Sequence, residues 1–364
     1  MDAIKLADFK ISVFTVPTQA DVESDGTLEW SSTTMILVEL KAGNQWGLGY
    51  TYGNAGIAPC AHSLIENNVL GQNALDISFI WSRLNRAIRN DGKSGLAAMA
   101  VSAIDVALWD LKAKILNISL ADLLGCFRHK IEVYGSGGFT SATYPELEQQ
   151  MRDWKNQGLR RFKMKVGTHP NEDPSRVAFV RECVGPQADL MVDANEAYDA
   201  TTALMLAQSF AKQEVSWFEQ PLRSQDIHGM TELRTKLPLG MVLADGEYIY
   251  DSSQTLNILQ NRSADVVQLD VTRCQGITGF LKSAALCEAF NIPISTHCAP
   301  SLHVALGSAL PGLLHLEYFF DHVRIEQEFF DGVMPAKNGF LTADLSRPGM
   351  GMIFKEKDAE RFRR

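Results

Sequence analysis

The sequence lacks the features of a secreted, membrane-bound or nucleic-acid-binding protein. Its six cysteines lie far apart and form no CxxC pair, which argues against a disulfide framework or a zinc site and favours buried free thiols in a reducing cytoplasm. There is no apolar signal-peptide core near the N-terminus and no run of about 18 apolar residues that could span a membrane. With a net charge of -9 and no lysine and arginine cluster, the chain offers no track for phosphates. We therefore expect a cytoplasmic protein without nucleic-acid or membrane partners.

The chain does contain ample apolar sequence, arranged in two different patterns. With 364 residues, 46% of them hydrophobic, it can form a large core and a second domain. Residues 1–130 predict an α+β domain with a three-stranded antiparallel sheet, whose last two strands are joined by a tight turn at Gly43-Asn44, and a buried helix. The strands are expected at residues 11–17, 33–40 and 45–51, and the helix at residues 96–116.

From residue 131 to residue 325, short apolar runs alternate strictly with amphipathic helical stretches. This order predicts parallel strands joined by right-handed crossovers, and therefore an α/β barrel of about eight strands. After residue 325 the alternation stops. The remaining segment, 326–364, contains glycine and proline, and we expect it to return to the N-terminal domain.

Seven ionisable residues stand at the C-terminal ends of successive apolar, β-branched runs. Their spacing, from 193−165 = 28 residues to 317−297 = 20, matches the roughly 20 to 30 residues of one strand-helix unit in a parallel barrel. Strand interiors of such barrels are buried, so an acid or base there needs a partner, a metal or water. One such residue could be accidental, but seven residues at similar spacing predict an active site. They are Lys165, Asp193, Glu219, Glu247, Asp270, His297 and Glu317.

Three of these residues, Asp193, Glu219 and Glu247, are carboxylates at the ends of three consecutive strands. They would converge at one rim, where carboxylates can share a site only if a cation neutralises them. Oxygen ligands with open positions favour Mg²⁺, with Mn²⁺ as the alternative, over Zn²⁺. The competing interpretation is that each acid pairs separately with a lysine or arginine, which suits a single acid better than three at equal spacing.

Two further pairs carry acid/base chemistry. Lys163 and Lys165 share one face of the second barrel strand, where two ammonium groups would lower each other's pKa and give a base usable near neutral pH. Alternatively, both simply reach solvent at the strand end. Across the mouth, Asp270 would fix the tautomer of His297 and leave its other nitrogen free to exchange protons. A lone histidine would more often be structural, but the aspartate one strand earlier favours a dyad.

These residues lie in motifs that resemble the enolase superfamily and, within it, the mandelate racemase subgroup. The likeness covers essentially the whole chain, and it implies a modified (β/α)7β TIM barrel, an N-terminal α+β capping domain and a tail packed against that cap. The branch with a second catalytic lysine on the sixth strand is disfavoured, because Asp270 holds that position. The motifs are KMK (163–165), VDAN (192–195), FEQP (218–221), DGE (245–247), LD (269–270), STH (295–297) and LE (316–317).

The resemblance also implies a role for each rim residue. Mg²⁺ would be held by the three carboxylates, and Lys165 and the His297-Asp270 dyad would be acid/base groups on opposite faces of a small carboxylate substrate. Lys163 would help bind the substrate carboxylate. Glu317 would donate a hydrogen bond to the developing enediolate, which requires a protonated carboxyl with a raised pKa.

Segments of the capping domain are expected to close the barrel mouth and select the substrate. Residues 18–32 form one loop, which is mostly polar and has Trp30 as its only aromatic residue. Residues 50–57 form another, with Tyr52 as a candidate contact. Within the barrel, Ser136 and Asn195 are the candidate substrate-binding residues. A polar lid suits a hydroxylated chain, and the lack of arginine in these loops favours a substrate with one carboxylate.

The expected reaction is the dehydration of an acid sugar, an aldonate or aldarate, to a 2-keto-3-deoxy acid. The alternative is racemisation or epimerisation of a 2-hydroxy acid, which uses the same residues when no leaving group is present. A non-catalytic barrel that binds a metal or sugar acid is a third interpretation, although every expected position holds a competent residue. A zinc hydrolase is disfavoured, because the rim has one histidine. The barrel is expected to form a homo-oligomer, either a dimer or an octamer.

Overall fold

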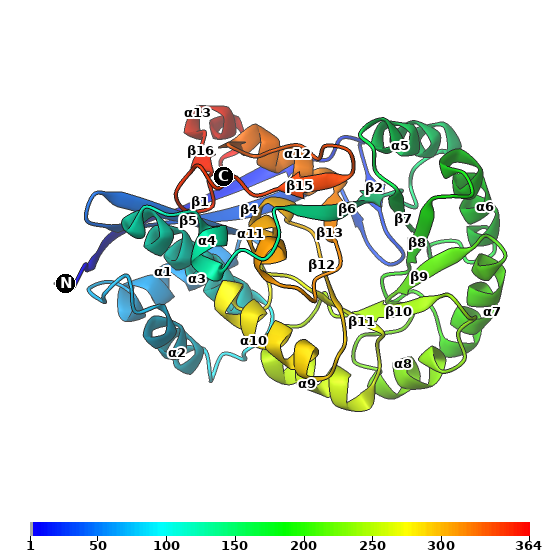
Figure 1. Ribbon diagram of the computed structural model, residues 1–364, viewed down its shortest axis with the longest axis horizontal. Coiled ribbons are helices and arrows are strands. Elements are labelled where there is room, and N and C mark those ends of the chain that lie inside the picture. Colours follow the sequence, from blue (N-terminus) through cyan, green and yellow to red (C-terminus); the bar gives the residue numbers. More distant parts are fainter. Residues whose placement is uncertain (1–2) are drawn as a thin grey trace.

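The computed structural model describes residues 3–364 and contains the expected three-stranded antiparallel sheet near the N-terminus (Figure 1). The strands lie in the order β1-β4-β5, and Gly43, at φ +57°, permits the two-residue turn between the last two. The expected strand 45–51 extends to Tyr52, so residues 50–52, which also fall within the expected loop 50–57, pair with β4 in the sheet. The bounds are β1 Leu6–Pro17, β4 Ser32–Ala42 and β5 Gln45–Tyr52.

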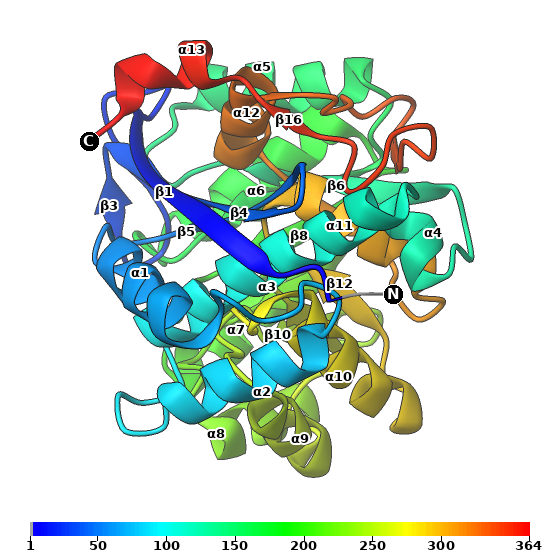
Figure 2. The ribbon, with the colours of Figure 1, turned by 90° about the vertical axis from the view of Figure 1, so that its left-hand side faces the viewer.

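The long helix α3 covers one face of this sheet and is buried around most of its circumference, as its apolar sequence predicted (Figure 2). Strand β5 lies directly on α3 because Gly49 has no side chain: a Cβ there would collide with the carbonyl oxygen of Ala103. Toward the barrel, Asp105 of α3 accepts hydrogen bonds from the backbone N–H and hydroxyl of Thr278, at 2.8 and 2.7 Å. The helices of this part are α1 Ile57–Asn68, α2 Ile77–Ala87, α3 Leu96–Leu116 and α4 Leu120–Leu124.

From residue 130 on, eight parallel strands alternate with seven helices in the described chain, which confirms the (β/α)7β arrangement. The strands lie in the order β12-β11-β10-β9-β8-β7-β6-β13, and Ile294 of β12 closes the ring through backbone hydrogen bonds with Gly312 and Leu314, just before β13. The strands are β6 Lys130–Gly137, β7 Arg161–Lys165, β8 Asp189–Asp193, β9 Val215–Glu219, β10 Val242–Asp245, β11 Val266–Leu269, β12 Ile294–Thr296 and β13 Leu316–Phe319. The helices are α5 Tyr144–Asn156, α6 Asp173–Val184, α7 Ala200–Ala211, α8 Ile227–Arg234, α9 Ser252–Asn261, α10 Gly276–Ala289 and α11 Pro300–Ala309.

After β13 the chain returns over both parts of the molecule. Strand β15 pairs antiparallel with β6, while the backbone N–H of Arg364 donates to the carbonyl of Val13 at 3.0 Å. Buried Asp110 of α3 accepts backbone hydrogen bonds from Leu48 in the sheet and Met350 in the tail, at 2.8 and 2.7 Å. The division of the chain into 1–130, 131–325 and 326–364 stays a prediction. The tail elements are α12 Phe320–Phe329, β14 Phe330–Asp331, β15 Phe340–Thr342, β16 Ile353–Phe354, α13 Glu356–Ala359 and a 3₁₀ turn, Glu360–Phe362.

Two expectations about composition can be compared with the fold. No helix within residues 3–364 is both long and apolar enough to cross a bilayer. The six cysteines all fall in this range and are free, but only Cys274, Cys287 and Cys298 are buried, and the other three are half-buried.

Candidate active site

The predicted acid/base and carboxylate residues meet at the C-terminal rim of the barrel. Each is at most 7% exposed, so each needs a partner for its charge, and the residues serve as one another's partners. Lys163 and Lys165 lie on β7, Asp193 ends β8, Glu219 ends β9 and Glu317 lies on β13, while Glu247, Asp270 and His297 follow β10, β11 and β12.

Asp193, Glu219 and Glu247 form a compact group of carboxylates. Each offers an oxygen, and these atoms lie within 4.8 Å of one another. Burial and then the neighbouring Asp193 raise the pKa of Glu219, which reflects the cost of crowding acids in a dry site. Among the described residues, nothing donates a hydrogen bond to the buried Oε2 of Glu247. An oxygen-only donor set with an unsatisfied atom fits Mg²⁺.

The two lysines pair with this group instead of weakening each other. Lys163 Nζ lies 2.7 Å from both Glu219 Oε1 and Glu317 Oε1, and Lys165 Nζ lies 2.5 Å from Asp193 Oδ2. Burial would lower both lysine pKa values, but the attraction of the carboxylates outweighs it and raises them. The expectation that the pair would have lowered pKa values is therefore wrong for this arrangement, because the surrounding acids outnumber the lysines.

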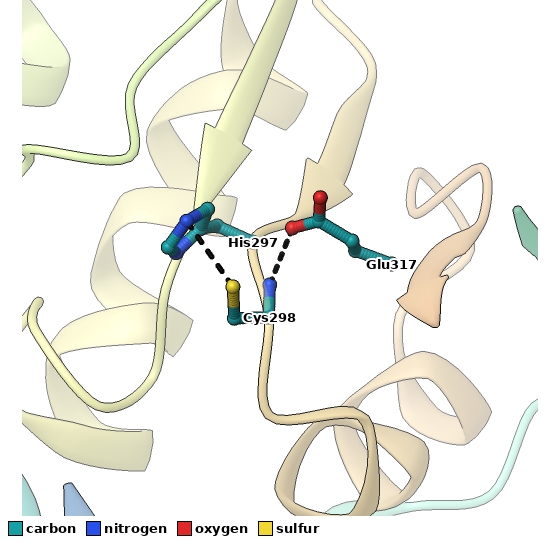
Figure 3. A group of neighbouring side chains, drawn as sticks. All are labelled: His297, Cys298 and Glu317. Atoms are coloured by element: carbon teal, nitrogen blue, oxygen red, sulfur yellow. Dashed lines mark hydrogen bonds between the residues drawn. The ribbon is translucent and has the colours of Figure 1, made fainter. Parts of the chain in front are cut away.

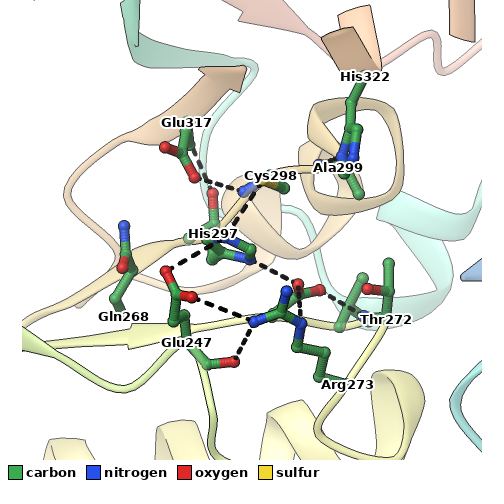
Figure 4. Close-up of polar contacts among 12 residues, drawn as sticks. Glu247, Gln268, Thr272, Arg273, His297, Cys298, Ala299, Glu317 and His322 are labelled. Carbon is green, nitrogen blue, oxygen red and sulfur yellow. Dashed lines mark hydrogen bonds and ion pairs between the residues drawn. The ribbon is translucent and has the colours of Figure 1, made fainter. Parts of the chain in front are cut away.

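His297 and Asp270 form the expected dyad. Nδ1 of His297 lies 2.7 Å from Asp270 Oδ2, while Asp270 Oδ1 accepts a hydrogen bond from the backbone N–H of Thr272 at 2.7 Å. Figure 4 shows His297 between Glu247 and Cys298. Burial would raise the pKa of Asp270, but the hydrogen bond and charge of His297 hold it below its usual range. Asp270 therefore stays ionised and accepts a hydrogen bond from the N–H at Nδ1 of His297. Nε2 then faces the site, 3.4 Å from Glu247 Oε2 and 3.3 Å from Cys298 Sγ.

Glu317 differs from the protonated donor that the resemblance implied. Its Oε1 accepts a hydrogen bond from the ammonium of Lys163, and its Oε2 accepts one from the backbone N–H of Cys298 at 2.6 Å. Burial would raise its pKa, but the ammonium of Lys163 outweighs burial and holds the pKa below its usual range. In this structure Glu317 is an ionised acceptor.

A short hairpin of the N-terminal part, β2 and β3, lies across the ends of β7 and β8. Thr27 at its turn donates to the carbonyl of Asn195 at 3.0 Å. Gly26 is pressed so closely onto the rim that a Cβ would collide with the carbonyl oxygen of Ala194 and lie 2.7 Å from that of Val166. The segment 18–32 therefore covers the mouth, as expected. The strands are β2 Glu23–Ser24 and β3 Glu29–Trp30.

Two family models match the chain and together cover most of its length. Residues 10–125 match the N-terminal domain of the mandelate racemase / muconate lactonizing enzyme family, and residues 146–358 match the enolase C-terminal domain-like family. The chain belongs to the enolase superfamily, in its mandelate racemase subgroup.

Curated relatives of this enolase-superfamily protein act on sugar acids by name. L-talarate/galactarate dehydratase of Salmonella typhimurium is 31% identical over 335 residues, which cover 90% of this chain and 82% of the relative. 3,6-Anhydro-alpha-L-galactonate cycloisomerase of Streptomyces coelicolor is 32% identical and covers 87% of each chain. D-gluconate dehydratase of Thermoproteus tenax is 27% identical, over 94% of this chain and 72% of the relative.

Solved structures of related proteins superpose on nearly the full length of this chain. A mandelate racemase/muconate lactonizing enzyme-like protein from Rubrobacter xylanophilus superposes with a TM-score of 0.96 at 44% identity, covering 99% of this chain and 100% of the other. A racemase from Streptomyces coelicolor with bound magnesium gives 0.93 at 27% identity, with coverage of 99% and 100%. The Salmonella dehydratase with magnesium and L-lyxarohydroxamate gives 0.92 at 29%, with coverage of 100% and 94%. Magnesium is thus the metal of this superfamily site.

The candidate substrate-binding residues of this superfamily member fall into two groups. Ser136 Oγ and Asn195 Oδ1 are buried and have no hydrogen-bond partner among the described residues, so both can bind a substrate oxygen. Trp30 instead packs edge-on against Phe139, with ring centroids 5.4 Å apart. Tyr52 stacks on His322 at 3.5 Å. The structure therefore gives Trp30 and Tyr52 packing contacts between the N-terminal part and residues that follow β6 and β13, and their binding role stays a prediction.

Sequence reasoning missed a second row of polar residues beneath the carboxylates. Gln268 Nε2 donates to Glu219 Oε2 at 3.1 Å and to the hydroxyl of Tyr134 at 2.9 Å, and the ring of Tyr134 faces the ammonium of Lys163. Gln268 lies on β11, two residues before Asp270. A polar side chain inside this apolar strand was the available signal for a residue that faces the site. Arg273, whose Nη1 lies 3.4 Å from Glu247 Oε1, had no such signal.

Proposed function

We propose that the protein is a magnesium-dependent acid-sugar dehydratase. The observation that carries the proposal is the position of the three carboxylates between two acid/base groups. Asp193 contacts Lys165 at 2.5 Å, and Glu247 contacts His297 Nε2 at 3.4 Å. A substrate carboxylate drawn to the carboxylate-bound cation would therefore have an ammonium on one side and an imidazole on the other.

The proton next to a carboxylate is weakly acidic, and its removal places negative charge on the carboxylate oxygens. Mg²⁺ held by Asp193, Glu219 and Glu247 would stabilise that charge. Lys163, with its Nζ between Glu219 and Glu317, is placed to bind one of the same oxygens. Ser136 and Asn195 offer unsatisfied oxygens for substrate hydroxyls.

Elimination then proceeds with balanced proton movements. Lys165 removes the proton from C2, the C–H electron pair forms the C2–C3 double bond, and the C3–O bond breaks as His297 Nε2 delivers a proton to the leaving oxygen. Water departs, and the enol becomes a 2-keto-3-deoxy acid. Lys165 can serve as the base only in its neutral form, and its ion pair with Asp193 favours the charged form. A cation bound to Asp193 would weaken this ion pair, because it would compete with Lys165 for the carboxylate.

We propose a monocarboxylate, an aldonate, as the preferred substrate. A second carboxylate would need a free cation near the site, and two buried or partly buried arginines close to the rim already have partners. Arg273 pairs with Glu247, and Arg176 donates to the carbonyls of Phe139 and Ala142, each at 3.0 Å. Among the relatives, D-gluconate dehydratase is named for a monoacid, whereas L-talarate/galactarate dehydratase is named for diacids.

A racemase is the second candidate, favoured by the Streptomyces coelicolor neighbour of that name. The same Lys165 and His297 would exchange the proton on opposite faces of C2 when C3 carries no leaving group. We also propose a cytoplasmic homo-oligomer, a dimer or octamer, which light scattering of the purified chain would test.

The decisive experiment is ¹H NMR in D₂O with Mg²⁺ and pooled aldonic, aldaric and simple 2-hydroxy acids. A dehydratase gives new 3-deoxy methylene signals, and an aldonate should give them fastest. A racemase instead exchanges the α-proton with the carbon skeleton intact. Lys165→Ala and His297→Asn should each abolish product formation, whereas Lys337→Ala, an exposed lysine in the tail, should not. Turnover that survives both active-site changes would contradict the proposal.

A further inference from the structure

A second group of ligand atoms lies beside the magnesium carboxylates. His297 Nε2, Cys298 Sγ and an oxygen of Glu317 lie within 4.8 Å of one another, and Sγ is 3.3 Å from Nε2 (Figure 3). All three residues are buried, with exposed fractions of 7%, 5% and 1%. The group shares no residue with Asp193, Glu219 and Glu247.

We propose that His297, Cys298 and Glu317 form a second metal site, which takes a borderline or soft divalent cation such as Zn²⁺ and excludes Mg²⁺. Imidazole and thiolate are the donors that Zn²⁺ prefers, whereas Mg²⁺ requires oxygen. Three protein ligands leave a fourth tetrahedral position open to water or another small ligand.

His297 is already oriented as a metal-binding histidine. Zinc-binding imidazoles commonly donate their other ring N–H to a carboxylate, which fixes the tautomer and directs the free lone pair at the metal. Here Nδ1 lies 2.7 Å from Asp270 Oδ2, so Nε2 carries the lone pair toward Cys298.

The backbone holds the Cys298 thiol toward that lone pair. Cys298 and Ala299 both have positive φ, +50° and +39°, a conformation that non-glycine residues seldom adopt. Their backbone N–H groups are held by Glu317 Oε2 at 2.6 Å and His322 Nδ1 at 3.2 Å. Burial lowers the pKa of His322 to about 3, so its neutral ring can accept this hydrogen bond.

Glu317 retains the capacity to coordinate a cation. An ionised carboxylate has about four lone-pair positions. Lys163 occupies one on Oε1 and the backbone N–H of Cys298 occupies one on Oε2, which leaves lone pairs on both atoms.

A cation in this site would block the proposed reaction, and this expectation rests on the proposed function. His297 Nε2 is the atom assigned to proton transfer, so a cation bound to it removes that proton carrier. Zn²⁺ should then inhibit an enzyme that Mg²⁺ supports, and substrate should protect against inhibition.

The test uses the full chain saturated with Mg²⁺ and then titrated with Co²⁺, whose bond to a thiolate gives a charge-transfer band in the near ultraviolet. Cobalt bound only by carboxylates gives no such band. The band should appear in the wild type and in Cys287→Ala, a control at a buried thiol on α10, and should be absent from Cys298→Ser. No band in the wild type, or an unchanged band in Cys298→Ser, would overturn the proposal.

Calorimetric titration with Zn²⁺, again with Mg²⁺ saturating, measures the histidine ligand. Affinity should fall at least about tenfold in His297→Asn and in Cys298→Ser, with circular dichroism confirming that both variants fold. Zinc binding as tight as in the wild type in both variants would refute the site. Neither readout needs a substrate, so failure of the metal site and failure of the proposed dehydratase activity remain distinguishable.

Discussion

At the scale of single residues, Asp270 shows how a side chain can control the reaction without touching the substrate. It holds Nδ1 of His297, so it determines which imidazole nitrogen carries the proton. Asp270→Asn keeps the shape but loses the charge that stabilises this tautomer and the protonated ring. We expect kcat to fall by roughly 10³- to 10⁴-fold with little change in KM.

The split between kcat and KM separates this positioning role from a structural one, because a distorted site would also change KM. Asp8→Asn, on the exposed edge of β1, is the control and should change neither constant. An unchanged kcat in Asp270→Asn would show that the dyad does not orient His297.

The identities of the rim residues could be predicted, but their charge states could not. Strand ends and equal spacing place Lys165, Asp193 and His297 at one rim, because parallel strands end on the same side. The pKa of Lys165 depends instead on how many acids surround it in space, and the sequence does not give that count. Cys298 was missed for a similar reason, since a positive φ turns its thiol toward His297.

At the scale of elements, the β2–β3 hairpin is the part of the cap most directly seated on the site. Gly26→Ala should prevent this seating, because the added Cβ would collide with the carbonyl oxygen of Ala194. We expect kcat/KM to fall by about 10- to 100-fold with little loss of global stability, since the change lies in a partly exposed turn. Gly312→Ala, where a Cβ meets nothing within 4 Å, is the matched control. Equal kinetics for the two variants would argue against closure by this hairpin.

The same hairpin should respond to pH through Glu23 on β2. Burial, and then the nearby Asp321, raise the pKa of Glu23 to about 8 from its ordinary value of 4.5. Between these values the folded protein holds a proton that the unfolded chain has released, so stability falls as pH rises from about 4.5 to about 8. Glu23→Gln stays neutral and should lose this part of the pH dependence.

Chemical denaturation of both proteins across this pH range measures the effect, because subtracting the two curves removes the contributions of all other groups. Parallel curves would show that Glu23 is ionised in the folded state.

The hairpin itself could not be foreseen, because strands of two residues carry no alternating pattern. The barrel strands were predictable because each is an apolar run next to a long amphipathic helix.

At the scale of the whole molecule, the tail joins the two main parts. Asp110 binds backbone N–H groups from the sheet and from the tail, and β15 extends the barrel sheet beside β6. The alternation of strands and helices predicted the barrel, since the pattern repeats along the chain. The tail's pairings were not predictable in detail, because they join short segments that are distant in sequence and lack a repeating pattern.

Metal binding should stabilise the whole fold, and Glu247 provides the sharpest test. Without a cation, Lys163 and Lys165 pair closely with Glu219 and Asp193, whereas Glu247 has only a 3.4 Å contact with Arg273 Nη1 on Oε1 and no hydrogen-bond donor on Oε2 among the described residues. Glu247→Gln should therefore change the stability of the metal-free protein little. With Mg²⁺ at about 100 times its Kd, the wild type gains about 2.7 kcal/mol, while the variant, which lacks one ligand charge, gains much less. Thermal unfolding with Mg²⁺ and with EDTA measures both effects, and Glu232→Gln, at an exposed acid on α8, is the control. If the wild type and Glu247→Gln responded equally to Mg²⁺, the cation would have to bind elsewhere.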